Sequence, residues 1–347
     1  MKVILVSMKY DYGDKSRGSS GDYYYFEEPL KHIVGKVLSF DFMTVFQEKG
    51  KEGMNRTLLD MVRSQKPDVT VFVPYTDQFI PQVVDEINNH TTTLGYFYDD
   101  TWRIDYSGFW AKHFTYATTS DVNGIKRWRD LGYNNFIYSP FGCNHRFFVK
   151  KKLLKKYDVT FVGGYHPYRA WCVRRLRNAG IDAHAWGYGW ANERLKFEGM
   201  VDVFNESRIN LNLSNNQSWD FRYVMSPMKP VRDTLKAIKS ALRAASGPDA
   251  KTREMVKARH FEINSCGGFQ LSYYVEGLER HYQIGEEIAI YESIDGMIDK
   301  VHYYLKHEDE REAVARCGYE RTLRDHRMEK RFGDLFDTIG MKNWRKD

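Results

Sequence analysis

Cysteine is scarce and widely spaced in this sequence. The 347 residues include four cysteines: Cys143, Cys172, Cys266 and Cys317. No two of them form a C-x-x-C pair, which argues against a zinc ribbon and against a disulfide-dense secreted domain. We therefore expect a protein of a reducing compartment, for which the cytoplasm is the simplest location.

Long apolar runs are also missing. The first apolar run, within MKVILVSMKY, ends at Lys9 and is too short for the hydrophobic part of a signal peptide. No stretch approaches the roughly 18 apolar residues of a membrane span. Any membrane association is therefore expected to be peripheral.

The charge balance is mildly basic, with a formal net charge of +6. Such an excess favours anionic partners such as nucleotide diphosphates, acidic polymers or membrane surfaces, although an ordinary basic surface would look the same. Aromatic residues reach 15% of the chain, including 24 tyrosines and 8 tryptophans. Aromatic rings fill cores, but they also stack on sugars and bases.

Short apolar runs alternate with helical patterns through the first part of the chain. Val3–Val6, Val69–Val73 and Leu94–Tyr98 are typical of buried parallel strands, and Asn55–Gln65 and Asp121–Leu131 have helical spacing. This alternation predicts a doubly wound α/β domain over residues 1–150.

The same pattern begins again after the basic segment Lys150–Lys156. Asp158–Val162 is a new apolar strand, and the helical segment Tyr168–Ala179 follows it. We predict a second Rossmann-like domain over residues 151–330, with a C-terminal helix and tail over 331–347 near the junction of the two domains.

Two basic segments stand apart from this alternation. Lys150–Lys156 is predicted to be a solvated linker, and 226–257 to be a basic helical insertion in the second domain. Contact of 150–156 and 227–257 with DNA or with an anionic membrane is the alternative.

The densest group of chemically useful residues is KARHFEINSCGGF. Lys257 and Arg259 could meet a diphosphate, and the Glu262 carboxylate could accept two hydrogen bonds from a ribose diol. Gly267 and Gly268 would let the backbone approach a ligand closely. A helix that ends in a glycine cap among ordinary surface charges is the alternative.

This segment continues through IGEEIAIYES and DKVHYYLKHEDEREAVARCGYERTLRDHRMEKRF. In this order, the motifs resemble the C-terminal domain of the CgeB-like, or spore-maturation-protein-like, glycosyltransferases. The DVTFVGG and WGYGW segments extend the resemblance back to about Asp158. The N-terminal half resembles the family only loosely.

The resemblance implies a GT-B fold, in which two Rossmann-like domains with parallel sheets face a central cleft that binds a nucleotide-sugar donor. Glu262 then matches a ribose-binding Glu, and Glu254 fits the E-x7-E spacing of related retaining enzymes. Further donor-binding residues are expected where strands of the second domain end; they are Gly163, Gly164, Arg169, Gly187, Tyr188, Asn212 and Ser214.

In the first domain, Asp99 and Asp100 follow an apolar strand. Either could deprotonate or hold an acceptor hydroxyl. The alternative is that Asp100 caps a helix, with Trp102 packed beneath it.

The sequence contains no Asp-x-Asp pair, the motif that holds the metal ion in GT-A enzymes. We therefore expect a metal-independent enzyme with no cofactor, using a nucleotide-sugar donor, with UDP as the expected nucleotide, and a saccharide or glycolipid acceptor. The alternatives are a phage-type DNA base glycosyltransferase and a non-catalytic nucleotide- or carbohydrate-binding protein.

Overall fold

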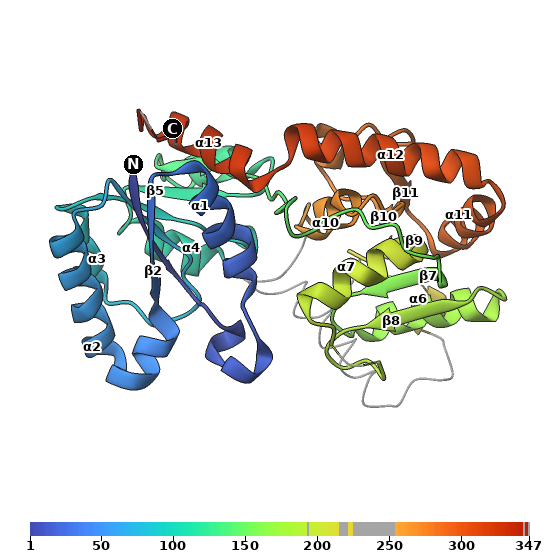
Figure 1. Cartoon of the computed structure of the whole chain (residues 1–347), viewed down its shortest axis with the longest axis horizontal. Coiled ribbons are helices and arrows are strands. Elements are labelled where there is room, and N and C mark those ends of the chain that lie inside the picture. The colour runs from blue at the N-terminus through green and yellow to red at the C-terminus, as the bar shows by residue number, and fades with distance from the viewer. Residues whose placement is uncertain (193, 215–220, 225–253, 343, 346–347) are drawn as a thin grey trace. The chain divides into compact units, whose positions relative to one another are not determined.

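The chain forms two compact units in a computed structural model (Figure 1), which describes all residues except 193, 215–220, 225–253, 343 and 346–347. The first unit combines Met1–Asn144 with Arg327–Asp347, and the second contains His145–His326. In the structure, the boundaries follow Asn144 and His326. The predicted boundaries, after residues 150 and 330, thus lie a few residues beyond them. The segment 331–347 forms part of the first unit.

The first unit is built on a six-stranded parallel sheet with the order β2-β1-β3-β4-β5-β6. Its strands are β1 (Lys2–Ser7), β2 (Lys36–Asp41), β3 (Val69–Phe72), β4 (Thr92–Gly95), β5 (Tyr116–Thr119) and β6 (Phe136–Tyr138). The apolar run in β1 is fully buried, as expected for a strand covered on both faces.

Helices cover both faces of this sheet. One core is shared with α2 (Phe42–Gln65), α3 (Pro81–Asn88), α4 (Ile104–Ala111) and α5 (Gly124–Asp130). The core on the other face is shared with α1 (Glu28–Ile33) and with the C-terminal helix α13 (Met328–Thr338). The last helix of the chain thus completes the core of the first unit.

The second unit contains a five-stranded parallel sheet with the order β11-β10-β9-β7-β8. Its strands are β7 (Tyr157–Val162), β8 (Ala183–Trp186), β9 (Ser207–Asn212), β10 (Gln270–Tyr273) and β11 (Ala289–Tyr291). Two parallel α/β units were predicted from the alternating pattern, and the structure confirms them.

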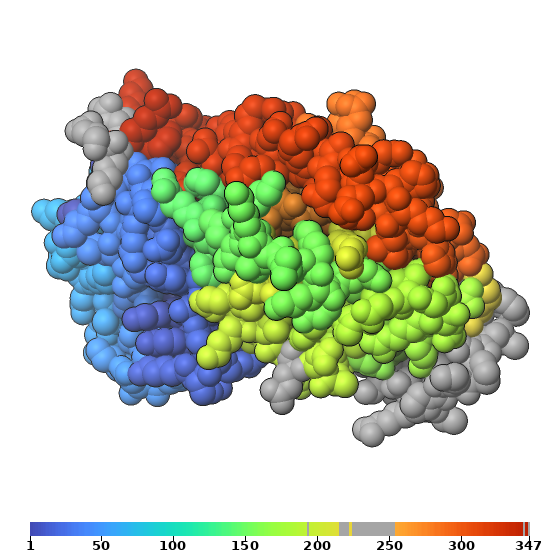
Figure 2. Space-filling model, turned by 45° about the vertical axis from the view of Figure 1, so that its right-hand side comes forward, coloured from blue at the N-terminus to red at the C-terminus, as the bar shows by residue number. Residues whose placement is uncertain are grey.

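The helices of the second unit are α6 (Pro167–Asn178), α7 (Phe197–Glu206), the single turn α8 (Phe221–Val224), α10 (Arg259–Ser265), α11 (Ile294–Lys306) and α12 (Glu308–Asp325). α6 packs against α11, and the two share a core with the sheet. In the space-filling view, the orange-red surface of α11 and α12 lies beside the lime-green surface of α6 (Figure 2). α7 packs against β7 and β9, while α10 packs against β9, β10 and α12.

The connections bring α6 and α10 to the carboxyl edge of the second sheet. α6 starts directly after β7, where Pro167 occupies its first position and the His166 ring accepts a hydrogen bond from the Tyr168 amide at 3.3 Å. α10 ends shortly before β10 begins, so its first turn lies toward the end of the sheet at which β9 finishes. Ligands bind at this edge in open α/β folds.

Candidate active site

One arginine ties together the carboxyl ends of β7 and β9. Arg169, in the first turn of α6, donates from Nε to the Leu213 carbonyl at 2.9 Å and from Nη1 to the Gly164 carbonyl at 3.0 Å. Burial lowers the pKa of this guanidinium, and the Glu254 carboxylate opposes that shift. A cation fixed by two backbone carbonyls therefore lies at the sheet edge.

The segment after β8 folds tightly onto the segment after β7. The Gly163 amide donates to the Trp186 carbonyl at 2.9 Å, and Trp190 Nε1 donates to the Gly163 carbonyl at 2.9 Å. Gly187 has a φ of 141°, and a Cβ at this position would overlap the Gly163 carbonyl. This close approach requires glycine.

This packing changes what the two glycine segments can offer a ligand. Because the Gly163 amide already donates to Trp186, it does not have the free N–H that phosphate binding requires. Gly164 is exposed. The Tyr188 side chain is 81% exposed beside it, so its ring can stack on a flat ligand.

A buried amide lies at the end of β9. Asn212 Oδ1 accepts a hydrogen bond from the Ser214 hydroxyl at 2.9 Å, and both residues are buried. Within the described parts of the chain, Asn212 Nδ2 has no hydrogen-bond partner. A buried N–H group without a partner costs about 1–3 kcal/mol, so a ligand acceptor at this position would be favourable.

Arg259 and Glu262 form an ion pair in the first turn of α10. Glu262 is only 3% exposed. The Arg259 guanidinium also lies 5.1 Å from the centre of the Phe204 ring and 3.8 Å from Met200 Sδ, both on α7. Arg259 is thus directed at Glu262 and α7, and it orients the carboxyl group.

Burial acts on both members of this pair. It raises the pKa of Glu262 to about 8 and lowers the pKa of Arg259 to about 10. Burial thus disfavours the charged form of both groups.

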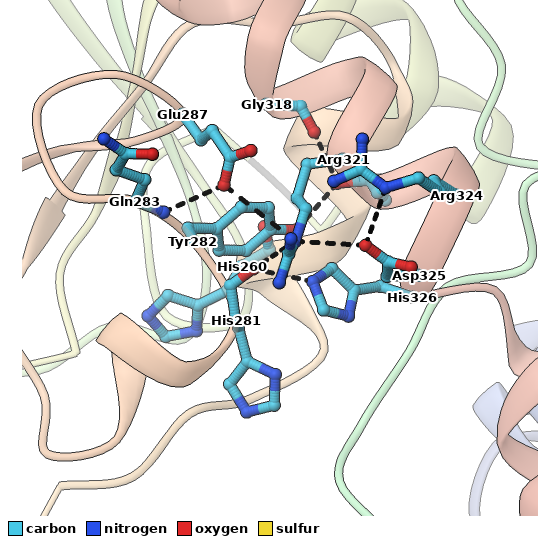
Figure 3. A network of polar contacts seen from close by, with 11 residues as sticks. His260, His281, Tyr282, Gln283, Glu287, Gly318, Arg321, Arg324, Asp325 and His326 are labelled. Carbon is cyan, nitrogen blue, oxygen red and sulfur yellow. Dashed lines mark hydrogen bonds and ion pairs between the residues drawn. The ribbon is translucent and has the colours of Figure 1, made fainter.

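A polar network lies behind the first turn of α10 (Figure 3). His260 Nε2 lies 3.2 Å from the Ser272 hydroxyl. The Tyr282 hydroxyl donates to the His260 carbonyl at 3.3 Å. Burial lowers the pKa of His260 to about 4, so the ring is neutral at pH 7. The contacts of His260 therefore help to fix α10 without adding a charge.

The same network reaches the end of α12. Arg321 Nε and His326 Nε2 lie 3.0 and 2.8 Å from the His281 carbonyl, and the hydroxyls of Tyr282 and Thr322 lie 2.7 Å apart. The turn that carries Glu262 is thus held from β10 and from α12, and such support keeps a binding group in place.

The other residues expected around α10 fall into two places. Lys257 directly precedes the helix, and its amide donates to His260 Nδ1 at 3.1 Å. Gly267 and Gly268 instead close the carboxyl end of α10, with the Gly268 amide donating to the Ile263 carbonyl at 3.1 Å. This arrangement matches the glycine-cap alternative, and it puts the two glycines at the end of α10 opposite to Arg259.

Asp99 and Asp100 have different surroundings in the first unit. Asp100 is fully buried, and its Oδ2 accepts from Trp128 Nε1 at 2.8 Å. Burial raises the pKa of Asp100 to about 6. The alternative that Asp100 caps a helix is wrong, because α4 starts at Ile104 with Arg103 in the cap position. Asp99 is the partly exposed member of the pair.

Asp22 is a buried carboxyl group that the sequence did not single out. Its two oxygens accept from the Met8 amide and from the Tyr98 hydroxyl, both at 3.1 Å. Burial raises the pKa of Asp22 to about 7. Met8 and Tyr98 follow β1 and β4 at the carboxyl edge of the sheet. Tyr98 lies 76 positions from Asp22, so no local pattern could reveal this contact.

The basic segment 150–156 is attached to α7 and β9. Lys151 Nζ pairs with Asp202 at 2.7 Å, and Lys155 Nζ donates to the carbonyls of Asn205 and Ser207 at 2.9 and 3.0 Å. Lys156 pairs with Glu206. These lysines are occupied within the unit. Residues 226–253 of the predicted basic insertion lie outside the described residues.

Metal-ligating side chains do not gather in the described part of the chain, where no group of three or more His, Cys, Asp or Glu residues could hold an ion. Among the same residues, no helix has the length and apolar character needed to cross a membrane.

The part of the chain that runs from the first turn of α6 into α13 is similar to a known family. A family model described as glycosyl transferase-like matches residues 169–337. These residues, just under half of the chain, are thus similar to a glycosyl transferase-like domain. Comparison with curated proteins gives no match.

Solved glycosyltransferase structures have the same fold as this chain. Sucrose-phosphate synthase from Thermosynechococcus elongatus has a TM-score of 0.60 at 9% identity, covering 98% of this chain and 99% of its own. HepE from Anabaena, in complex with UDP-glucose, has a TM-score of 0.60 at 7% identity, covering 99% and 100%.

A third structure is the pneumococcal O-GlcNAc transferase GtfA in complex with UDP and GlcNAc. It has a TM-score of 0.52 at 11% identity, and covers 84% of this chain and 60% of its own. The predicted GT-B fold class is confirmed by these likenesses, which at such identities concern the fold alone.

Proposed function

We propose that this protein is a metal-independent glycosyltransferase of the CgeB-like type, which moves a sugar from a nucleotide-diphosphate sugar to a hydroxyl group of a saccharide or glycolipid. The proposal is supported by the carboxyl edge of the second sheet, where Arg169, the Asn212 amide and the turn bearing Glu262 occur within the segment that is similar to a glycosyl transferase-like family. The cytoplasm, with or without peripheral membrane attachment, is the proposed location.

UDP is the proposed nucleotide. HepE and GtfA are described in complexes with UDP-glucose and with UDP and GlcNAc, respectively. In the proposed donor complex, Glu262 accepts hydrogen bonds from the ribose hydroxyls, and Arg259 orients it. Tyr188, or Trp186 beside it, stacks on the base.

The diphosphate is assigned to the cations and N–H donors of the same edge. Arg169 lies there, Lys257 precedes α10, and the Asn212 amide and the exposed Gly164 segment add neutral donors. Together they would stabilise the negative charge that develops as the leaving group departs.

The transfer breaks the bond between the anomeric carbon and the diphosphate oxygen, and the leaving diphosphate keeps the electron pair. The acceptor hydroxyl oxygen forms the new bond through an oxocarbenium-like transition state. Its proton passes to a carboxylate, for which Asp99 is the exposed candidate, or to the departing diphosphate. Both the retaining and the inverting outcome fit this scheme.

Donor binding is tested by thermal shift with UDP, UDP-sugars and other nucleotide diphosphates, with chelator present. We expect UDP to raise the Tm of the wild type, because binding to the folded state stabilises by about 2.7 kcal/mol at a hundredfold excess over Kd. Arg169→Ala should lose most of this response, because hydrogen bonds to charged groups contribute about 1.5–3 kcal/mol.

Arg177→Ala is the matched control. Arg177 lies on the same helix and also donates to a backbone carbonyl, that of Ala183 at 2.9 Å. Ala183 starts β8, so this contact lies at the opposite end of the strands and the control should keep the full response. If no nucleotide near millimolar concentration stabilises the wild type, the donor site is wrong.

Turnover separates a transferase from a binding protein. Slow release of UDP from the sugar nucleotide that gives the largest shift would identify an enzyme. Binding without release would favour the non-catalytic alternative. DNA glycosylation gains no support from the described basic segment, because Lys151, Lys155 and Lys156 are already bonded within the second unit.

A further inference from the structure

Tyr12 has an unusual backbone conformation in the loop after β1. Its φ is 51° and its ψ is 29°, in the left-handed region that disfavours residues with a Cβ. The side chain is 53% exposed. Glycine would adopt this conformation without strain, so the fold alone gives no reason for a tyrosine here.

The loop around Tyr12 is fixed on both sides. The Asp11 amide donates to the Gly18 carbonyl at 3.1 Å, and the Gly13 amide donates to the Tyr10 carbonyl at 3.0 Å. Arg17 Nε pairs with the Asp11 carboxylate at 2.9 Å. The left-handed conformation is thus imposed by its surroundings. Backbone strain that is imposed in this way is common at functional sites.

A second ring and a cation border the exposed ring. The Tyr75 ring centre lies 5.5 Å from that of Tyr12 at an interplanar angle of 66°, and the Arg17 guanidinium lies 5.1 Å from the Tyr12 ring centre. The Tyr75 carbonyl accepts a hydrogen bond from Arg103 at 2.8 Å, which holds its backbone. We call Tyr12, Tyr75 and Arg17 the aromatic ledge.

The ledge lies where ligands bind in this class of fold. Tyr12 follows β1 and Tyr75 follows β3, which is the neighbour of β1 in the sheet. Both therefore lie at the carboxyl edge of the first sheet. Tyrosine offers a large apolar face with a polar tip, and arginine offers several N–H donors.

We infer that the aromatic ledge binds a sugar ring of a saccharide acceptor. The C–H face of the sugar would lie on the Tyr12 ring, and its hydroxyls would accept hydrogen bonds from Arg17. The inference rests on the proposed transferase activity, which requires an acceptor, and it narrows that acceptor to an oligosaccharide or to the saccharide part of a glycolipid.

The test measures binding of four disaccharides to the full chain by ligand-observed NMR titration: maltose, cellobiose, lactose and N,N′-diacetylchitobiose. We expect the wild type to bind at least one of them in the millimolar range. Tyr12→Gly should weaken that binding at least fivefold while its Tm is equal to or above that of the wild type, because glycine removes the strain together with the ring.

Three further variants keep the result interpretable. Tyr12→Phe retains the ring and should bind within twofold of the wild type, and Tyr75→Ala should weaken binding as Tyr12→Gly does. Phe109→Ala removes an aromatic side chain that is 49% exposed on α4 of the same unit, and it should leave binding unchanged.

The ledge is wrong if none of the four sugars binds the wild type, or if Tyr12→Gly binds as tightly as the wild type. UDP-induced thermal shifts in the same samples separate this failure from that of the donor site. A normal UDP response without sugar binding would contradict only the proposed sugar binding by the ledge. Sugar binding that depends on Tyr12, without any UDP response, would contradict only the proposed donor site.

Discussion

The pairing of Arg259 with Glu262 gives the second unit a titratable buried group. Burial raises the pKa of Glu262 to about 8 in the folded state, above its ordinary value of 4.5. Its stabilising contribution should therefore be complete below about pH 4.5 and be lost as the pH rises through about 8. Each pKa unit corresponds to about 1.4 kcal/mol.

The measurement is the free energy of unfolding in urea between pH 5 and 8. The advantage of the wild type over Glu262→Gln should fall by up to a few kcal/mol as the pH rises. Arg259→Met should extend the decline to higher pH, because the cation beside the carboxyl group is then gone. A difference that stays constant with pH would mean that Arg259 keeps the carboxylate ionised throughout.

Individual side chains also show which parts of the site could not be predicted from the sequence. The motif around α10 pointed to Glu262 and Arg259, but their pairing depends on burial against Met200 and Phe204 of α7. Asp22 had no signal at all, because its bonds to Met8 and Tyr98 form only when the ends of two strands meet. Local patterns cannot report such contacts.

Among the elements, the tight segment after β8 depends on Gly187. Alanine there would strain the backbone at φ 141° and overlap the Gly163 carbonyl. Gly187→Ala should destabilise the protein by clearly more than the roughly 1–2 kcal/mol of a left-handed alanine, and it should weaken the UDP response.

Gly180→Ala is the control for strain without overlap. Gly180 has a φ of 79°, and a Cβ there would meet nothing within 4 Å. Urea unfolding of the two variants should therefore give a larger loss for Gly187→Ala. Equal losses would show that strain accounts for the whole effect and that the close approach does not matter.

The elements that the sequence predicted best are those with strong local patterns. Val3–Val6 lies in β1, and Tyr168–Ala179 lies within a residue of α6. The patterns gave no strand for β10 or β11, whose 4 and 3 residues are too short for periodicity to be decisive. α2 begins at Phe42, well before the predicted helix start at Asn55. The chain is also helical before Gly50, which itself has a non-helical conformation inside α2.

At the scale of the whole molecule, the first unit depends on a helix from the far end of the chain. Phe332 and Phe336 of α13 are fully buried, and Leu335 is 2% exposed. Full burial of one such side chain contributes about 1.5–3 kcal/mol, whereas a whole domain is stable by about 5–15 kcal/mol. Truncation after His326 should therefore unfold the first unit.

Limited proteolysis followed by mass spectrometry checks this prediction. The truncated chain should lose protection in residues 1–144, while a protected fragment near His145–His326 keeps its UDP response. On the same helix, Phe332→Ala should cost about 3–5 kcal/mol, and the exposed Asp334→Ala about 0.5 kcal/mol or less. Retained protection of residues 1–144 after truncation would contradict the role of α13.

The discontinuous first unit has a consequence for synthesis on the ribosome. Residues 1–144 emerge first, but α13, which covers part of one face of their sheet, is made only after the second unit. The second unit, which is continuous in sequence, can finish folding during translation. The nascent first unit must therefore wait with an apolar face uncovered, and chaperones have their longest opportunity to bind there.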